Sequence, residues 1–90
     1  MASEVGWTGR QWVCLRRLWN KESNWDHLAV NPSSGATGIP QALPGDKMSS
    51  AGADWETVPA TQIGWGLAYI AGRYGLPCTA LNHSRINGWY

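Results

Sequence analysis

The only two cysteines, Cys14 and Cys78, constrain the fold of this 90-residue chain more than any other feature. A single domain of this size buries a modest share of its surface and needs further stabilisation. A disulfide between the two residues would contribute roughly 3–4 kcal/mol in the chain-entropy description and would indicate an oxidising compartment. The alternative is a pair of buried free thiols, which pack as small apolar side chains. We favour the disulfide.

Composition narrows the class of protein further. The chain has seven Trp, three Tyr and no Phe, so the aromatic part of the core must carry polar atoms that need partners. A net charge of +1 argues against a nucleic-acid-binding surface, and the basic cluster Arg10, Arg16 and Arg17 is interpreted as a solvated helix face. No apolar run of about 18 residues is present, so we expect no membrane insertion.

Apolar residues recur at helical spacing early in the chain and predict a helix over residues 9–23. Thr8, followed by Gln11 three residues later, has the pattern of a capping box at its start. Glu22 falls in the last turn, where the negative end of the helix dipole disfavours an ionised carboxyl group. We therefore expect a raised Glu22 pKa.

The remainder predicts a second long helix that begins at Pro59 and ends near Gly75. Shorter helices are expected over residues 46–51 and 77–83. A glycine inside a helix costs about 1 kcal/mol relative to Ala, so close packing against another backbone is expected at Gly64, Gly66 and Gly72. The predicted fold class is mainly α, with two long helices, short helices, a Gly/Pro-rich central loop and room for a short irregular hairpin in that loop.

Two segments suggest chemistry: 22–25 (Glu-Ser-Asn-Trp) and 35–41 (Gly-Ala-Thr-Gly-Ile-Pro-Gln). They place a carboxyl group at a helix end before a glycine-rich loop that lets a backbone approach a ligand closely. Gln41 offers both a donor and an acceptor to a sugar. Together the segments resemble the lytic transglycosylase signature of the goose-type lysozyme superfamily, and are closest to its actinobacterial or phage tail-associated members.

The resemblance covers nearly the whole chain and implies a lysozyme-like domain that cleaves peptidoglycan. It implies that Glu22 is the catalytic acid. It also implies a substrate groove lined by Ser23, Gly38, Gln41, Tyr69 and His83. Three departures from the family pattern stand out. Pro40 replaces a Met of the family motif, the loop over residues 29–36 is one residue longer than in the better-known soluble enzymes, and His83 occupies the region of the family's final Ala-Tyr-Asn motif.

Most glycosidases use two carboxyl groups. None of the five other acids stands in a recognisable partner motif: Glu4, Asp26, Asp46, Asp54 and Glu56. The resemblance implies lytic transglycosylation, in which one Glu first donates and then accepts a proton. Asp26 or Asp54 across the groove would instead allow water activation and hydrolysis. The apolar neighbours Leu18, Trp19 and Trp25 are expected to raise the pKa of Glu22 by desolvation.

We expect residues 1–90 to form one lysozyme-like domain, either alone or excised from a larger protein. The expected partner is the glycan strand of peptidoglycan, with no nucleic acid, no metal and no cofactor, and the protein is expected to be a monomer. The expected location is extracellular or cell-wall associated, as a secreted or phage tail protein. Two alternatives stay open: a hydrolysing muramidase, and a non-catalytic peptidoglycan-binding domain. Core packing is preferred over sugar stacking for three tryptophans: Trp25, Trp55 and Trp89.

Overall fold

A computed structural model describes residues 7–87 as helices joined by loops. In chain order these are α1 (Arg10–Ser23), the 3-10 helix η2 (Gly45–Ala51), α2 (Pro59–Arg73) and α3 (Pro77–Asn87). The central loop contains two isolated antiparallel bridges, between Val30 and Thr37 and between Thr37 and Ala42. The predicted mainly α class is confirmed. Within residues 7–87, no helix is both long and apolar enough to cross a bilayer.

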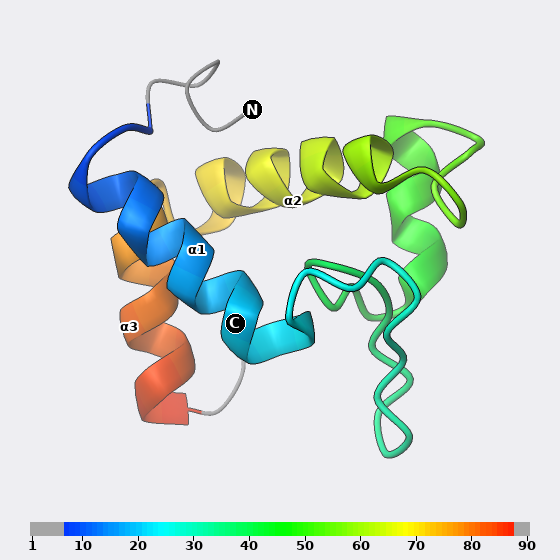
Figure 1. The fold of residues 1–90 in the computed structure, drawn as a ribbon, viewed down its shortest axis with the longest axis horizontal. Helices are drawn as coiled ribbons and strands as arrows, with labels where there is room; N and C mark the ends of the chain where they lie inside the picture. Colours follow the sequence, from blue (N-terminus) through cyan, green and yellow to red (C-terminus); the bar gives the residue numbers. More distant parts are fainter. Residues whose placement is uncertain (1–6, 88–90) are drawn as a thin grey trace.

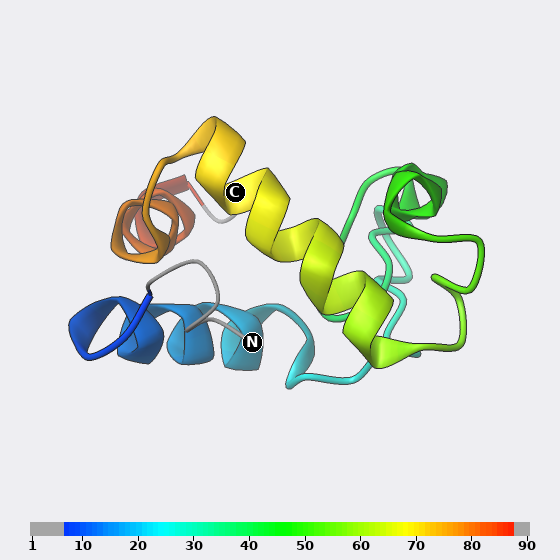
Figure 2. The same cartoon turned by 90° about the horizontal axis from the view of Figure 1, so that it is seen from above.

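The helices form two groups at opposite sides of the molecule (Figures 1 and 2). Helices α1 and α3 pack against each other at one side, while η2 and the central loop lie at the other. Helix α2 runs from η2 back to α3 and so connects the two sides. Cys14 pairs with Cys78, and Lys21 contacts Ser84, so α1 and α3 run in the same direction.

The core lies where α1, α2, α3 and the turn at Ile39 meet. Each fully buried aliphatic side chain of this kind contributes about 1.5–3 kcal/mol. Trp19 is completely buried and, together with the buried Trp7, forms the aromatic part of the core. The buried residues of the cluster are Trp7, Leu15, Leu18, Trp19, Ile39, Leu67, Ile70, Ala80 and Leu81.

Cys14 and Cys78 form a disulfide whose Cα atoms lie 4.9 Å apart. It joins the second turn of α1 to the first turn of α3, and the two cysteines are 64 positions apart in the sequence. The expected disulfide is therefore present, and the alternative of two free thiols is wrong.

The start of α1 differs from the expectation. Its N-cap is Gly9, and no side chain caps it, so the predicted capping box of Thr8 and Gln11 is wrong. The Gln11 side-chain oxygen instead accepts the backbone N–H of Cys78 at 3.0 Å. Gln11 thus satisfies a donor in the first turn of α3, which has no partner within its own helix.

The glycines of α2 also correct the expectation. A Cβ atom at Gly66 would lie 2.5 Å from Cζ2 of Trp19 and 3.1 Å from Cβ of Pro40, so the close packing there is against side chains rather than a backbone. At Gly64 and Gly72 a Cβ atom would meet nothing within 4 Å. Helix α2 begins at Pro59 as predicted, whereas α3 extends one turn beyond the predicted end, to Asn87.

Candidate functional site

Glu22 is half-buried in the last turn of α1 and points at α3. The hydroxyl group of Ser84 donates to Oε1 of Glu22 at 3.3 Å. The Lys21 amine donates to the same Ser84 hydroxyl at 2.6 Å and to the Ser84 carbonyl at 2.9 Å. Because the Ser84 oxygen already accepts from Lys21, its own hydrogen is left for Glu22. We call this set the Lys21–Ser84–Glu22 chain.

The pKa of Glu22 is raised above its ordinary value of 4.5. Burial is the largest cause, because it disfavours the charged carboxylate. The Ser84 hydrogen bond and the positive charge of Lys21 lower the pKa and only partly offset burial. The predicted direction is confirmed, and the leading cause is the desolvation expected from the apolar neighbours of Glu22. A raised pKa favours a carboxyl group that can act as a proton donor.

The chain turns sharply just after Glu22. Asn24 and Trp25 both have positive φ angles, of 54° and 60°, which a bulky side chain rarely adopts. The Trp25 ring packs edge-on against Trp19 with centroids 5.1 Å apart, and against Trp12 at 6.2 Å. These ring contacts offset the cost of the positive φ angle at Trp25. They also favour the core role expected for Trp25.

The glycine-rich segment is anchored through the backbone of Ile39. The Ser23 hydroxyl donates to the Ile39 carbonyl at 2.7 Å, and the Ile39 N–H donates to the side-chain oxygen of Gln62 at 2.9 Å. Gly38 has a φ of 77°, and a Cβ atom there would overlap the Gln62 amide. The Ser23 hydrogen bond and the close approach of Gly38 to Gln62 therefore fix the position of the turn at Ile39.

Gln62 is the central polar residue of this half of the molecule. It is completely buried, and its amide nitrogen donates to the carbonyls of His27 at 3.0 Å and Trp55 at 2.8 Å. One side chain thus joins three separate loop segments to α2. Sequence reasoning missed it, because a Gln inside a helix usually faces solvent and only the tertiary fold brings these backbone groups to it.

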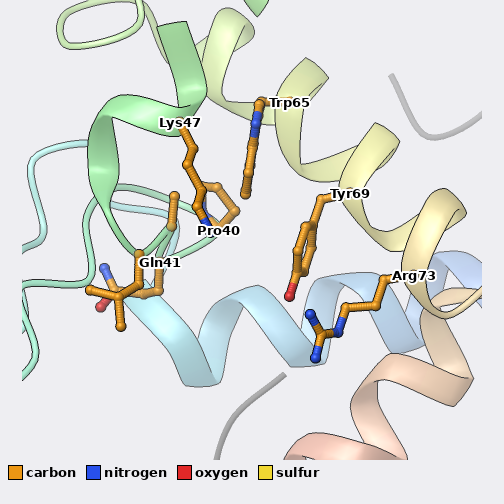
Figure 3. A pocket seen from close by; sticks show the side chains of 8 residues that line it. Pro40, Gln41, Lys47, Trp65, Tyr69 and Arg73 are labelled. Atoms are coloured by element: carbon orange, nitrogen blue, oxygen red, sulfur yellow. The ribbon is translucent and has the colours of Figure 1, made fainter. Parts of the chain in front are cut away.

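Gln41 stands at the end of the same turn with a φ of 56°. Its side-chain nitrogen donates to the carbonyls of Gly38 at 2.9 Å and Ala29 at 3.3 Å, so it closes the turn upon itself. Gln41 also lines a pocket (Figure 3). It therefore combines the loop-tying role with a place at a surface where a ligand could bind.

The pocket lies between α2 and the segment from Pro40 to η2 (Figure 3) and has a volume of about 210 Å³. On the α2 side, the rings of Trp65 and Tyr69 stack with centroids 5.1 Å apart and planes 13° apart. The lining residues are Pro40, Gln41, Ala42, Leu43, Lys47, Trp65, Tyr69 and Arg73. We call this the Trp65–Arg73 pocket.

Tyr69 connects this pocket to the α1–α3 side. Its ring contacts that of Tyr74 at 6.3 Å, and Tyr74 contacts His83 at 5.3 Å, which precedes Ser84 in α3. Burial raises the pKa of Tyr69, the charge of Tyr74 raises it further, and the charge of Arg73 lowers it. Tyr69 therefore stays protonated as a hydrogen-bond donor at neutral pH.

The structure places the predicted site residues in three neighbouring positions. Gln41 and Tyr69 line the Trp65–Arg73 pocket. Ser23 and Gly38 support the turn at Ile39. Glu22 lies on the α3 side, where its hydrogen-bond partner Ser84 directly follows His83. Glu22 is not among the lining residues of that pocket. The roles of these residues towards a substrate remain predictions.

The two Asp residues considered as second carboxyl groups are used in local turns. Oδ1 of Asp26 accepts the N–H of Leu28 at 2.9 Å, and Oδ1 of Asp54 accepts the hydroxyl of Thr61 at 2.7 Å. Over residues 7–87, no three His, Cys, Asp or Glu side chains cluster in a way that would hold a metal ion. Glu4 and Trp89 lie outside the described residues.

Sequence reasoning missed the cationic residues of the site. Trp65, Tyr69 and Arg73 follow one another at intervals of four, which puts them on one face of α2, and that spacing could have identified Arg73 once Tyr69 was singled out. No such signal marks Ser84 or Lys47, whose places depend on tertiary packing.

Trp55 lines a second hollow of about 180 Å³ together with His27 and Gln62.

Comparisons of the chain with known protein families, with curated proteins and with solved structures find no match.

Proposed function

We propose that this chain is a lysozyme-like domain of the lytic transglycosylase class. It cleaves the β-1,4 glycosidic bond between N-acetylmuramic acid and N-acetylglucosamine in peptidoglycan, with Glu22 as the acid and base. The observation that carries the proposal is the half-buried Glu22 carboxyl group, with its raised pKa and its hydrogen bond from Ser84. The resemblance of segments 22–25 and 35–41 to the family signature supplies the substrate.

In the proposed reaction, protonated Glu22 donates its proton to the glycosidic oxygen as the bond to the anomeric carbon breaks. The N-acetyl group of the substrate stabilises the positive charge at that carbon. The Glu22 carboxylate then accepts the proton of the muramoyl 6-hydroxyl, whose oxygen bonds to the anomeric carbon and forms a 1,6-anhydro ring. The Ser84 hydroxyl and the Lys21 charge favour the carboxylate between the two steps. Proton transfer by a positioned group contributes a factor of about 10²–10⁴.

The same proposal includes a binding partner, a location and an oligomeric state. The partner is the glycan strand of peptidoglycan, and the disulfide is in keeping with an oxidising, extracellular location. The domain acts as a monomer, either secreted or as part of a phage tail protein. The proposed reaction needs no second carboxyl group, since one Glu performs both proton transfers.

A second candidate function is glycan binding without cleavage. It is favoured by one observation: the Trp65–Arg73 pocket presents stacked aromatic rings and an amide, whereas Glu22 is not among its lining residues. A pocket of this composition could hold a sugar whether or not a carboxyl group is near the bond.

Mass spectrometry of bacterial cell-wall sacculi incubated with the protein separates these functions. Lytic transglycosylation predicts soluble fragments that end in 1,6-anhydromuramic acid. A hydrolysing muramidase would give reducing ends heavier by one water molecule. Sacculi that bind the protein but release no fragments would contradict cleavage and leave glycan binding as the function.

A further inference from the structure

The Lys21–Ser84–Glu22 chain has a fixed direction. The ammonium group of Lys21 can only donate hydrogen bonds, and it donates to both the carbonyl and the hydroxyl oxygen of Ser84, at 2.9 and 2.6 Å. The single hydrogen of the Ser84 hydroxyl group is then directed at Oε1 of Glu22, with 3.3 Å between the two oxygens. Because Ser84 is completely buried, bulk water does not compete for this hydrogen. The chain therefore delivers one donor to one oxygen of the Glu22 carboxyl group.

Ser84 does not use its hydroxyl group as helical serines usually do. A serine inside a helix commonly donates to the carbonyl three or four residues earlier, which here would be Leu81 or Ala80. The Ser84 hydroxyl donates to Glu22 of α1 instead. Since one ammonium group contacts both the carbonyl and the hydroxyl oxygen of Ser84, Lys21 holds the serine side chain in the orientation that allows this bond.

The two oxygens of Glu22 differ in their surroundings. Oε1 accepts the Ser84 hydrogen bond, whereas the residues that the structure describes provide no hydrogen bond to Oε2. A protonated carboxyl group has one O–H donor and one carbonyl oxygen that remains an acceptor. The Ser84 donor therefore favours the form of Glu22 that has its carbonyl at Oε1 and its proton on Oε2.

Other charged and titratable groups near this chain do not set its direction. Burial, the Ser84 hydrogen bond and the charge of Lys21 are the causes of the shift in the Glu22 pKa. On α3, His83 and Arg85 flank Ser84 in the sequence. His83 packs against the ring of the tyrosine that follows α2, and Arg85 is exposed. Lys21 is thus the cation that both contacts Ser84 and acts on Glu22.

We propose that Lys21 and Ser84 are positioning residues that give the two oxygens of Glu22 separate roles: Oε1 accepts the Ser84 hydrogen bond, and Oε2 carries the proton that is transferred. The inference rests on the proposed function for the reaction and adds the atom at which both transfers take place. Oε2 donates its proton to the glycosidic oxygen as the bond to the anomeric carbon breaks. The same atom then accepts the proton of the attacking 6-hydroxyl group, and between the two steps Ser84 stabilises the negative charge that Oε1 shares.

Infrared difference spectroscopy of the protonated carboxyl group tests this assignment. Protein with isotope-labelled glutamate is measured at acidic pH, and the C=O band of Glu22 is the one that Glu22→Gln lacks. A donor at the carbonyl oxygen weakens the C=O bond, so Ser84→Ala and Lys21→Met should each shift the band to higher wavenumber. Ser84→Ala retains the backbone carbonyl that Lys21 contacts, and so separates the hydroxyl group from this contact at the end of α3. A band that stays in place in either variant would overturn the inference.

The same spectra recorded across pH give a second readout. Loss of the hydrogen bond or of the Lys21 charge disfavours the carboxylate, so the midpoint of the Glu22 titration should rise in both variants. The double variant should shift it by less than the sum of the single shifts, because the Ser84 bond depends on Lys21. Arg85→Met removes an exposed cation next to Ser84 and should leave band and midpoint unchanged, and circular dichroism confirms that each variant is folded. Additive shifts, or an equal shift in Arg85→Met, would contradict the role of Lys21.

Dye release from labelled peptidoglycan distinguishes this inference from the proposed function. At a pH where Glu22 is protonated in both proteins, Ser84→Ala should release dye about tenfold more slowly than the wild type, since it lacks a hydrogen bond to the charge that develops on the carboxyl group. If the wild type releases no dye but the spectra change as expected, the arrangement of the two oxygens stands and the cleavage proposal falls. If the wild type releases dye and the spectra do not change, cleavage stands and the inference falls.

Discussion

The α1–α3 pair and the η2–α2 region are held together by different kinds of interaction. Between α1 and α3, residues 63 to 67 positions apart are joined by the Cys14–Cys78 disulfide, by the Gln11 cap on α3 and by the Lys21–Ser84 hydrogen bonds. Around η2 and α2, the loop segments converge on the single buried side chain of Gln62. In the first region several separate contacts join the two helices, whereas in the second one buried side chain joins three loop segments to α2.

The difference has a functional counterpart, because each region carries one part of the candidate site. The α1–α3 pair positions the Glu22 carboxyl group through Ser84, whereas the η2–α2 region forms the Trp65–Arg73 pocket. The two are joined by the Ser23–Ile39 hydrogen bond and by the Trp19 ring against Gly66. Proton transfer and glycan binding should therefore be separable by substitution.

The largest effect is expected at Gln62, which joins three loop segments to α2. Gln62→Leu keeps the volume but leaves the Ile39 N–H and the carbonyls of His27 and Trp55 without their partner. A buried orphan group costs about 1–3 kcal/mol. Because the contacts to the His27 and Trp55 carbonyls are only part-buried, we expect the lower part of the summed range, a loss of roughly 3–5 kcal/mol in the free energy of unfolding in urea. Gln11→Leu, which removes one hydrogen bond from the other region, should cost only about 1 kcal/mol. Similar losses in the two variants would contradict the comparison.

Removal of the Cys14–Cys78 disulfide tests the α1–α3 pair. The double variant Cys14→Ala, Cys78→Ala is expected to lose roughly 3–4 kcal/mol of stability, because the unfolded chain regains its freedom. The thermal unfolding midpoint should fall to the same value in the wild type treated with a reductant. A wild type whose midpoint does not respond to reduction would show that the covalent link contributes nothing to this pair.

The contact between the two regions is tested by two glycines of α2. Gly66→Ala inserts a methyl group against the Trp19 ring and is expected to cost about 1–3 kcal/mol. Gly64→Ala, two residues away, meets open space and should stabilise the helix by about 1 kcal/mol. The opposite signs, measured by urea unfolding, distinguish packing from helix propensity. The account fails here if both substitutions stabilise the protein.

The smallest expected effect is the pH dependence of stability at Glu22. Its folded-state pKa is raised, so the folded protein holds this proton more tightly than the unfolded chain does. Ionisation therefore lowers stability as pH rises from the ordinary pKa of 4.5 through the raised value. Glu22→Gln stays neutral and should unfold at a higher temperature than the wild type at about pH 7. The difference should vanish near pH 4, and a variant that is less stable at neutral pH would contradict the raised pKa.

The local features of the fold could be predicted from the sequence. The apolar spacing of α1 and the Pro59 signal of α2 are properties of neighbouring residues, and both helices lie where the pattern places them. The capping box failed because Gln11 is used in a tertiary contact with Cys78, which no local pattern reveals. The central loop was recognised as irregular, but the arrangement of its turns depends on Gln62.

The candidate site was predictable to a similar extent. Glu22 and its raised pKa follow from a carboxyl group on a helix with apolar neighbours, and Gln41 and Tyr69 do lie at a pocket. Ser84 could not be found, because a serine in a short C-terminal helix carries no signal until α3 packs beside α1. Arg73 was within reach through its spacing from Tyr69.

The central claim is that the Glu22 carboxyl group performs the proton transfers that break the glycan. The most direct test is the release of dye from labelled peptidoglycan by Glu22→Gln beside the matched control Glu56→Gln, an exposed glutamate outside the candidate site. The account predicts that Glu22→Gln loses activity at least about a hundredfold with its fold intact, and that Glu56→Gln keeps wild-type activity. A Glu22→Gln variant that releases dye at the wild-type rate would contradict it.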